Sequence, residues 1–402
     1  MKIVIVTVAL LLNLLVYWRV AVSEKSWVNI LTPQFLLSIP MIYVFEIIYL
    51  VNVENYLSTF GYLIIFSAYV LPLIFFAGAY VYGAPIKFFL LDKTDAVNSK
   101  SRATILLFSA VVLYLPVLRE FGSDIFNPRA IYTATRTGFG IAYFGSIVLC
   151  YIFFIYILFR PAGTRIEKII ALLFTMVFGY LHGSKGQIIT VILMGLLYYS
   201  VVRGVRLKIM AFLIFFSVFS LMGGIVFFSM STGLEFGDLL LSMTGYSDYS
   251  RNAVMLIDAD KGFHFGRIFF EDNFFSRIPR AIMPDKPKDF GSFSLALQYF
   301  PERFYQDEGA PAFGIGALYA DFGIWILVFL SISGFLSGLA AKTLVVRLRR
   351  HQRPGDFALL CFFCGIVIIP VGSGYLLPEH LVLALLMNGA FPLMLVRKYK
   401  NE

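Results

Sequence analysis

The chain has 402 residues, of which 59% are hydrophobic, 17% aromatic and 14% charged. Soluble domains carry about 25% charged residues, and the mean hydropathy of +0.82 lies well on the apolar side. This composition excludes soluble enzyme folds and indicates a polytopic membrane protein. The formal net charge of +9 is better explained by Lys and Arg that anchor cytoplasmic loops than by nucleic-acid binding, which we do not expect.

Long apolar runs divide the chain into candidate membrane spans, since a helix needs about 20 apolar residues to cross a bilayer. The predicted spans cover residues 3–18, 29–50, 60–82, 103–118, 138–159, 169–183, 187–202, 209–231, 312–340, 357–377 and 380–396. We therefore predict an all-α polytopic membrane fold with about eleven transmembrane helices. The first run follows Lys2 without a small-residue cleavage site, so we expect a retained helix rather than a signal peptide.

Basic residues assign the two sides of the membrane, because cytoplasmic loops are enriched in Lys and Arg. One alternating set of loops is strongly basic and is predicted to be cytoplasmic; it contains Arg19 and Lys25, Lys87 to Arg102, Arg160 to Lys168, Arg203 to Lys208, Lys342 to Arg353 and Arg397 to Lys400. The opposite set contains the largest polar segment, residues 232–311. We expect this segment to form an external, partly helical loop inserted in one integral domain, residues 1–402, with the C-terminus inside and the N-terminus outside.

The sequence shows no pattern for a bound cofactor or metal. No Gly-rich phosphate loop is present, and the pair Asp258-Ala259-Asp260 is more typical of a turn than of a metal site. Cys150, Cys361 and Cys364 lie inside apolar runs, which favours neither a disulfide nor a metal. We predict no cofactor and no metal, so that the energy for bond formation would come from an activated lipid substrate.

The predicted outer loops carry several Lys and Arg residues, although such residues are normally depleted from short loops outside the cytoplasm. They include Arg129 and Arg136 in the 119–137 loop, Lys185 in the turn Gly183-Ser184-Lys185-Gly186, and Arg251, Arg277 and Arg280 in the large loop. The planar fork of arginine suits phosphate, and neighbouring glycines let a phosphate approach backbone N–H groups. The pattern favours a site for a lipid-linked diphosphate. The alternatives are that the arginines pair with the acidic residues of the loop, and that the lysine extends toward lipid headgroups.

Other side chains near these cations are candidates for further roles. An acceptor hydroxyl can require a general base, and the candidate catalytic residues are Asp248, His264 and Glu379. The candidates for contact with glycan are Tyr249, Tyr319 and Asp321. An acid within an apolar span is by default functional or paired, which applies to Asp321 and equally to Glu46. A lone histidine is more often packed or solvated than catalytic, and that alternative stays open for His264.

Several strings resemble one known family. Arg277-Ile278-Pro279-Arg280 precedes Pro284-Asp285-Lys286-Pro287, and Pro311-Ala312-Phe313-Gly314-Ile315-Gly316 precedes Tyr319-Ala320-Asp321-Phe322-Gly323. With the order of spans and the late large loop, these strings resemble the Wzy-type polymerases of oligosaccharide repeat units, the O-antigen polymerases. Members carry an Arg, ten residues and a Gly in two outer loops; Arg129…Gly140 and Arg251…Gly262 fit this pattern, as do Arg280…Gly291 and Arg303…Gly314. Where the family usually has an arginine in the glycine turn, this chain has Lys185.

The resemblance implies a membrane glycosyltransferase of GT-C-like architecture in the bacterial inner membrane, with its active face toward the periplasm. It implies that a growing glycan leaves its polyprenyl diphosphate and joins an incoming repeat unit, while arginines stabilise the departing diphosphate. The implied partners are undecaprenyl-diphosphate-linked oligosaccharides, membrane lipids and a co-polymerase that regulates chain length.

Two other functions remain as alternatives. An O-antigen ligase is expected to show a His, ten residues and a Gly in the large loop, whereas His264 has Phe275 at that spacing. A transporter or flippase of lipid-linked oligosaccharides usually binds near the membrane midplane through broken helices and intramembrane charge. The charges here gather at one face, which favours an enzyme.

Overall fold

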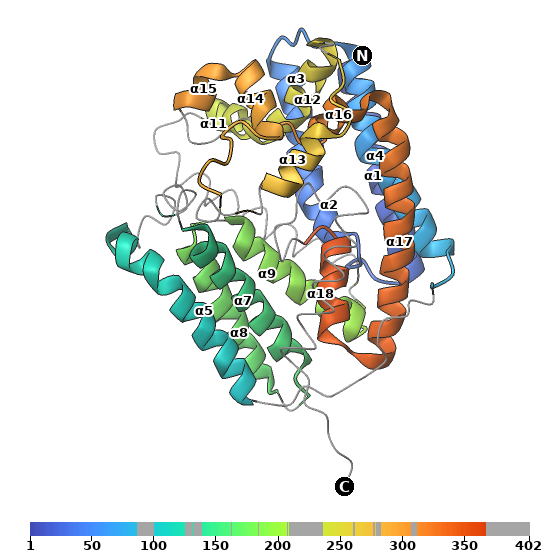
Figure 1. Ribbon diagram of the computed structural model, residues 1–402. Helices are drawn as coiled ribbons and strands as arrows, with labels where there is room; N and C mark the ends of the chain where they lie inside the picture. The colour runs from blue at the N-terminus through green and yellow to red at the C-terminus, as the bar shows by residue number, and fades with distance from the viewer. Residues whose placement is uncertain are drawn as a thin grey trace.

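The structure is a computed structural model that describes residues 1–86, 100–124, 131, 139–161, 163–183, 185–206, 208, 236–259, 262–275, 278, 283–306 and 312–366. The regular structure in these residues is helical throughout (Figure 1), as the composition predicts. Six helices in the described part are long and apolar enough to cross a membrane: Lys2–Glu24, Thr32–Asn52, Thr59–Tyr82, Ala103–Asp124, Ala142–Phe159 and Gly316–His351. The chain is therefore a multi-pass membrane protein.

The predicted number of spans, about eleven, is not confirmed. Three predicted spans fall on shorter helices, which are α8 (Arg165–Leu181), α9 (Lys185–Leu197) with its π-helical continuation η3 (Tyr198–Val202), and α18 (Pro354–Phe363). Charged residues occupy the first turn of α8, which shortens its apolar part. The predicted spans at 209–231 and 380–396, and residues 367–377 of the predicted span 357–377, lie outside the described residues. The GT-C-like architecture stays a prediction.

One helix bundle contains α1 (Lys2–Glu24), α4 (Thr59–Tyr82) and α17 (Ile326–His351), on the right of Figure 1. α17 meets α4 closely because Gly334 and Gly338 lie one turn apart on the shared face. A Cβ atom on Gly334 would lie 2.2 Å from the Pro72 carbonyl oxygen, and one on Gly338 would lie 2.2 Å from the Phe76 carbonyl oxygen. Small residues of this kind let helix backbones approach inside membranes, where packing drives association.

A second bundle contains α5 (Lys100–Phe121), α7 (Gly140–Phe159), α8 and α9, on the left of Figure 1. The C-terminal half of α7 is buried on all sides, which its uninterrupted apolar sequence predicts. α18 contacts both α7 and α17, and η3 contacts α17, so these two short elements connect the bundles.

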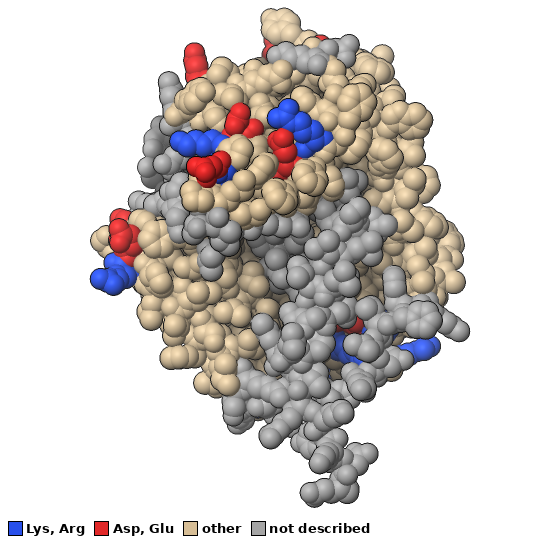
Figure 2. All heavy atoms as spheres, in the orientation of Figure 1, with Lys and Arg blue, Asp and Glu red and all other residues tan. Residues whose placement is uncertain are grey.

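Short helices from the predicted large loop gather at one end of the molecule. They are α11 (Phe236–Met243), α12 (Asp248–Ala259), α13 (Arg267–Phe275), α14 (Ser292–Tyr299) and α15 (Pro301–Gln306). α12 packs on α4 and on α16 (Gly316–Phe322), the short helix that precedes α17. A small apolar core that includes Leu256, Ile268, Leu295 and Phe313 joins α12, α13, α14 and α15 to α16. Acidic and basic side chains are intermixed on this upper part in Figure 2.

The two ends of the first bundle differ in their polar contacts. At the loop end, Lys2 Nζ donates to the Asn55 carbonyl oxygen at 2.5 Å, and the backbone N–H of Ser58 donates to Asp258 on α12 at 2.7 Å. At the far end, Arg349 on α17 donates to Glu24 on α1 at 2.7 Å. The N-terminus thus lies beside the loop helices, and the basic end of α17 lies opposite to them (Figure 1).

Candidate functional site

The guanidinium group of Arg251 on α12 lies in a buried polar cluster formed with the preceding 3-10 turn η4 (Thr244–Ser247) and with α3 (Phe45–Asn52), on which η4 packs. Its Nη1 atom donates to Glu46 Oε2 at 3.0 Å and to Ser247 Oγ at 3.0 Å. Its Nη2 atom donates to the Thr244 carbonyl oxygen at 2.8 Å and also to the Asp248 carboxylate. The two ends of the planar fork therefore hold two different carboxylates, one from a predicted membrane span and one from the loop helix.

Glu46 is an acid within an apolar span, and the structure shows that it is paired. Its side chain is fully buried, and Tyr62 donates its phenol O–H to the second carboxylate oxygen, Oε1, at 2.5 Å. The Tyr49 ring covers one face of the Arg251 guanidinium, with 3.7 Å between Cζ and the ring centroid. A buried charge requires a partner and further hydrogen bonds, and Glu46 has both.

Asp248 is the open member of this cluster. Its side chain is 53% exposed, whereas that of Arg251 is 10% exposed. Tyr249 follows on α12 and is exposed as well. The structure thus brings two predicted residues, Asp248 and Arg251, into contact, and it leaves the Asp248 carboxylate and the Tyr249 ring accessible from outside.

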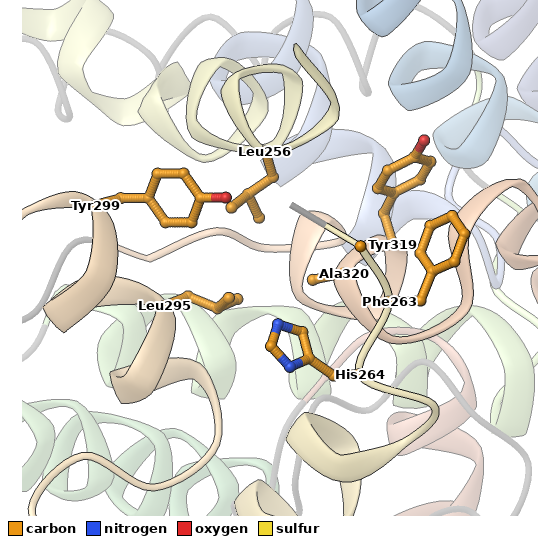
Figure 3. A pocket seen from close by; sticks show the side chains of 8 residues that line it. Leu256, Phe263, His264, Leu295, Tyr299, Tyr319 and Ala320 are labelled. Carbon is orange, nitrogen blue, oxygen red and sulfur yellow. The ribbon is translucent and has the colours of Figure 1, made fainter. Parts of the chain in front are cut away.

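A small pocket is lined by two other predicted residues, His264 and Tyr319, although the Tyr319 ring lies beside Phe263 and points away from His264 (Figure 3). Its remaining lining residues are Leu256, Gly262, Phe263, Leu295, Tyr299 and Ala320. The lining contains no Lys, Arg, Asp or Glu, so the pocket suits a group with both apolar and hydroxyl surface better than it suits a phosphate.

Two glycines allow the segment that carries His264 to turn. Gly262 and Gly266 have φ angles of +84° and +87°, which side chains rarely adopt. The backbone N–H of His264 donates to the Ala320 carbonyl oxygen at 2.9 Å and fixes the segment against α16. The position of Gly262 in the pattern Arg251…Gly262 is therefore explained by the backbone turn that follows α12.

Asp321 is paired inside the protein. Its side chain is 1% exposed, and its carboxylate oxygens accept the backbone N–H groups of Ile268 at 3.0 Å and Phe269 at 2.7 Å. These groups belong to the first turn of α13, where N–H groups lack intrahelical partners. Asp321 thus caps α13 from α16, and its predicted contact with glycan stays a prediction.

Acidic residues of α13 anchor the proline-containing segment that follows. Glu271 pairs with Arg267 at 2.7 Å and accepts the Gly291 N–H at 2.8 Å, while Asp272 accepts the Ser292 N–H at 3.0 Å. Burial raises the pKa of the Asp272 carboxyl, although hydrogen bonds from Ser292 oppose this. Burial also acts to raise the pKa of Glu271, but its bonds to Gly291 and Arg267 outweigh it and hold that pKa below the usual range. Arg267 therefore follows the alternative in which a loop arginine pairs with an acidic residue of the loop.

The remaining predicted residues lie beyond what the structure describes. Arg129, Arg136, Arg277, Arg280 and Glu379 fall outside the described residues. Lys185 is the first residue of α9, after a turn in which Gly183 has a φ angle of +66°; its backbone is described and its side chain is not. In the part of the chain that is described, no cluster of His, Cys, Asp or Glu is arranged to hold a metal ion.

Comparison with known proteins identifies the family. No family model and no solved structure matches the chain. The O-antigen polymerase of Salmonella typhimurium (strain LT2) and the O-antigen polymerase of Salmonella typhi are each 36% identical to it over 369 residues, which cover 90% of this chain and 89% of each relative. The chain belongs to the O-antigen polymerase family. The resemblance that the loop strings indicate is thereby confirmed.

For this member of the O-antigen polymerase family, sequence reasoning missed the residues that hold Arg251. Glu46, Tyr49 and Tyr62 come from the first helices of the chain, far from the large loop. The sequence does give one indication, which is Glu46 itself, because a carboxylate within an apolar span needs a partner. The sequence does not specify which of the loop arginines that partner is.

Proposed function

We propose that this chain is a polymerase that joins polyprenyl-diphosphate-linked oligosaccharide repeat units into O-antigen or a related surface polysaccharide. The observation that carries the proposal is the 36% identity to O-antigen polymerases over 90% of the chain. The reaction is glycosyl transfer, and the enzyme is a membrane glycosyltransferase. Its substrates are lipid-linked, in keeping with a multi-pass membrane protein.

The reaction takes place at the end of the molecule where the loop helices gather, which we assign to the periplasmic face of the bacterial inner membrane. The far end of α17 supports this assignment, because its last turn carries Arg349, Arg350 and His351, and basic loop residues favour the cytoplasmic side. The loop end holds the exposed Asp248 and Tyr249 and the pocket at His264.

The bond that breaks joins the growing glycan to the diphosphate of its carrier, and the bond that forms joins the same sugar carbon to an acceptor hydroxyl oxygen. The diphosphate leaves as an anion. We propose that it is held by the cations Arg129, Arg136, Lys185, Arg251, Arg277 and Arg280. The placement of Lys185 at the start of α9 supports its inclusion, because the first N–H groups of a helix favour an anion.

The acceptor hydroxyl loses a proton when the new bond forms. Asp248 is our first candidate for the base, because its carboxylate is exposed and lies beside a proposed diphosphate ligand, Arg251. His264 and Glu379 remain candidates for the same role. Tyr249 and Tyr319 are proposed to contact the glycan, and Asp321 is proposed to contribute by holding α13 and the His264 segment in place. A co-polymerase that sets chain length is a proposed partner.

A gel of surface glycan from cells with the gene deleted and restored tests this function. We expect the deletion to reduce the long ladder to a single repeat unit on its acceptor, and restoration to recover the ladder. Polymer that accumulates on the carrier lipid and never reaches the acceptor would instead indicate a ligase. Repeat units that build up on the cytoplasmic side would indicate a flippase.

A further inference from the structure

The contacts of Arg251 divide into fixed and exchangeable ones. Glu46, Ser247 and the Thr244 carbonyl oxygen are buried with it, and the Tyr49 ring packs on its face. Replacing any of these groups with a ligand from solution would require the turn Thr244–Ser247 to unpack from α3.

Asp248 is different, because its carboxylate is half exposed and reaches Arg251 from the outside. An incoming anion that takes up the Nη2 hydrogen bond must therefore displace Asp248 from it. A diphosphate oxygen carries the same kind of charge as a carboxylate oxygen and accepts the same hydrogen bond.

From this geometry we infer that Asp248 occupies the anion site of the empty enzyme, that a diphosphate displaces its carboxylate from Arg251, and that Glu46 is the positioning residue that keeps Arg251 in place during the exchange. The inference rests on the proposed function, which supplies the diphosphate. It adds a role for a buried residue of α3 and gives Asp248 an effect on binding. The exchange also releases the Asp248 carboxylate beside the bound diphosphate, where a proposed base is needed.

The exchange predicts opposite effects for the two acids that contact Arg251. Asp248→Asn removes a competitor for the anion, so affinity should rise. Glu46→Gln removes the charge that holds the guanidinium, so affinity should fall. An acid with a purely structural role would lower affinity or leave it unchanged, and a base with no part in binding would leave it unchanged.

The experiment is titration of inorganic pyrophosphate into the purified full-length protein, followed by calorimetry. We expect Asp248→Asn to bind at least about fivefold more tightly than the natural protein, and Arg251→Ala and Glu46→Gln to bind at least about tenfold more weakly. Glu302→Gln is the matched control, because it removes an exposed carboxylate of α15 and reports the general effect of one negative charge. It should change the affinity less than about twofold.

Affinity in Asp248→Asn that is no higher than in Glu302→Gln would overturn the inference, and so would unchanged affinity in Glu46→Gln. Glu46→Asp, which keeps the charge on a shorter side chain, should bind between the natural protein and Glu46→Gln. If Glu46→Gln does not fold, the pyrophosphate affinity of Asp248→Asn alone tests the inference. Pyrophosphate binding requires no polymer, so a failed inference is distinguishable from a failed proposed function. If the inference fails, the titrations of the variants do not show the predicted affinities. If the proposed function fails, deletion of the gene does not shorten the glycan ladder.

Discussion

At the scale of single residues, Arg251 shows what the sequence predicts and what it leaves out. The sequence predicts a charged residue in an outer loop with a fork suited to oxyanions. It does not predict that one end of the guanidinium group binds Glu46 and the other binds Asp248, because Glu46 is 205 residues away in the sequence. Asp321 is similar: an acid in an apolar segment is expected to be paired, but the backbone N–H groups of α13 that pair with it are visible only in the fold.

Arg251→Lys tests whether the fork matters. A lysine ammonium is a single point charge and cannot reach Glu46 and Asp248 at once. Losing a hydrogen bond to a charged group costs about 1.5–3 kcal/mol, so we expect at least about tenfold less polymer per unit of protein in membranes, close to the result for Arg251→Ala. Arg267→Lys is the control, because Arg267 is 63% exposed and pairs with Glu271, a neighbour on its own helix. A normal glycan ladder from Arg251→Lys would contradict this.

His264→Ala tests the pocket. Loss of a hydrogen bond to a sugar would reduce polymer by about tenfold, whereas loss of proton transfer would reduce it by at least about a hundredfold. We expect at least the smaller effect, with unchanged protein in the membrane fraction and partial recovery in His264→Gln. The control is His351→Ala, an exposed histidine at the far end of α17. Equal ladders from His264→Ala and His351→Ala would show that His264 takes no part in binding or catalysis.

At the scale of elements, the long apolar runs could be predicted and the short helices could not. Runs of about 20 apolar residues correspond to α1, α4, α5 and α7 with small errors at their ends. The helices α13 to α15 are only six to nine residues long and mix polar with apolar side chains, and they are held by tertiary contacts such as Gly291 N–H to Glu271. Tertiary contacts of this kind are not encoded in local periodicity, so the sequence predicted only a partly helical loop there.

The contact between α4 and α17 depends on the two glycines of α17. Gly334→Leu or Gly338→Leu would place a side chain into the α4 backbone, where a Cβ alone would lie 2.2 Å from a carbonyl oxygen. We expect either variant to lower the amount of folded protein severalfold, since overpacking costs about 1–3 kcal/mol or more. The measurement is fluorescence-detected gel filtration of a tagged protein. Gly78→Leu on α4 is the control, because a Cβ there meets nothing within 4 Å. Equal peaks from all three variants would contradict the close approach.

At the scale of the whole molecule, charge and hydropathy predicted a polytopic helical protein, and its described helices agree. The structure also separates a loop end from a basic end along the first bundle. From the basic last turn of α17 we infer that this end faces the cytoplasm and that the loop end faces the periplasm. Four members of the proposed diphosphate site, Arg129, Arg136, Arg277 and Arg280, lie outside the described residues.

Single cysteines test the assigned orientation. The three native cysteines are buried and should not react with an impermeant maleimide. We expect Lys288→Cys, exposed in the loop, to be labelled in cells whose outer membrane alone is permeable. Arg350→Cys, exposed at the end of α17, should be labelled only after the inner membrane is opened. The reverse pattern would place the loop helices in the cytoplasm.

The most direct test of polymerase activity is reconstitution of the purified protein in liposomes with a single repeat unit on polyprenyl diphosphate. The account predicts a ladder of glycans that grows by one repeat unit per step, with release of one polyprenyl diphosphate for each bond formed, and no ladder from Arg251→Ala. Substrate that remains a single repeat unit with folded natural protein would contradict the claim that this chain itself forms the bond.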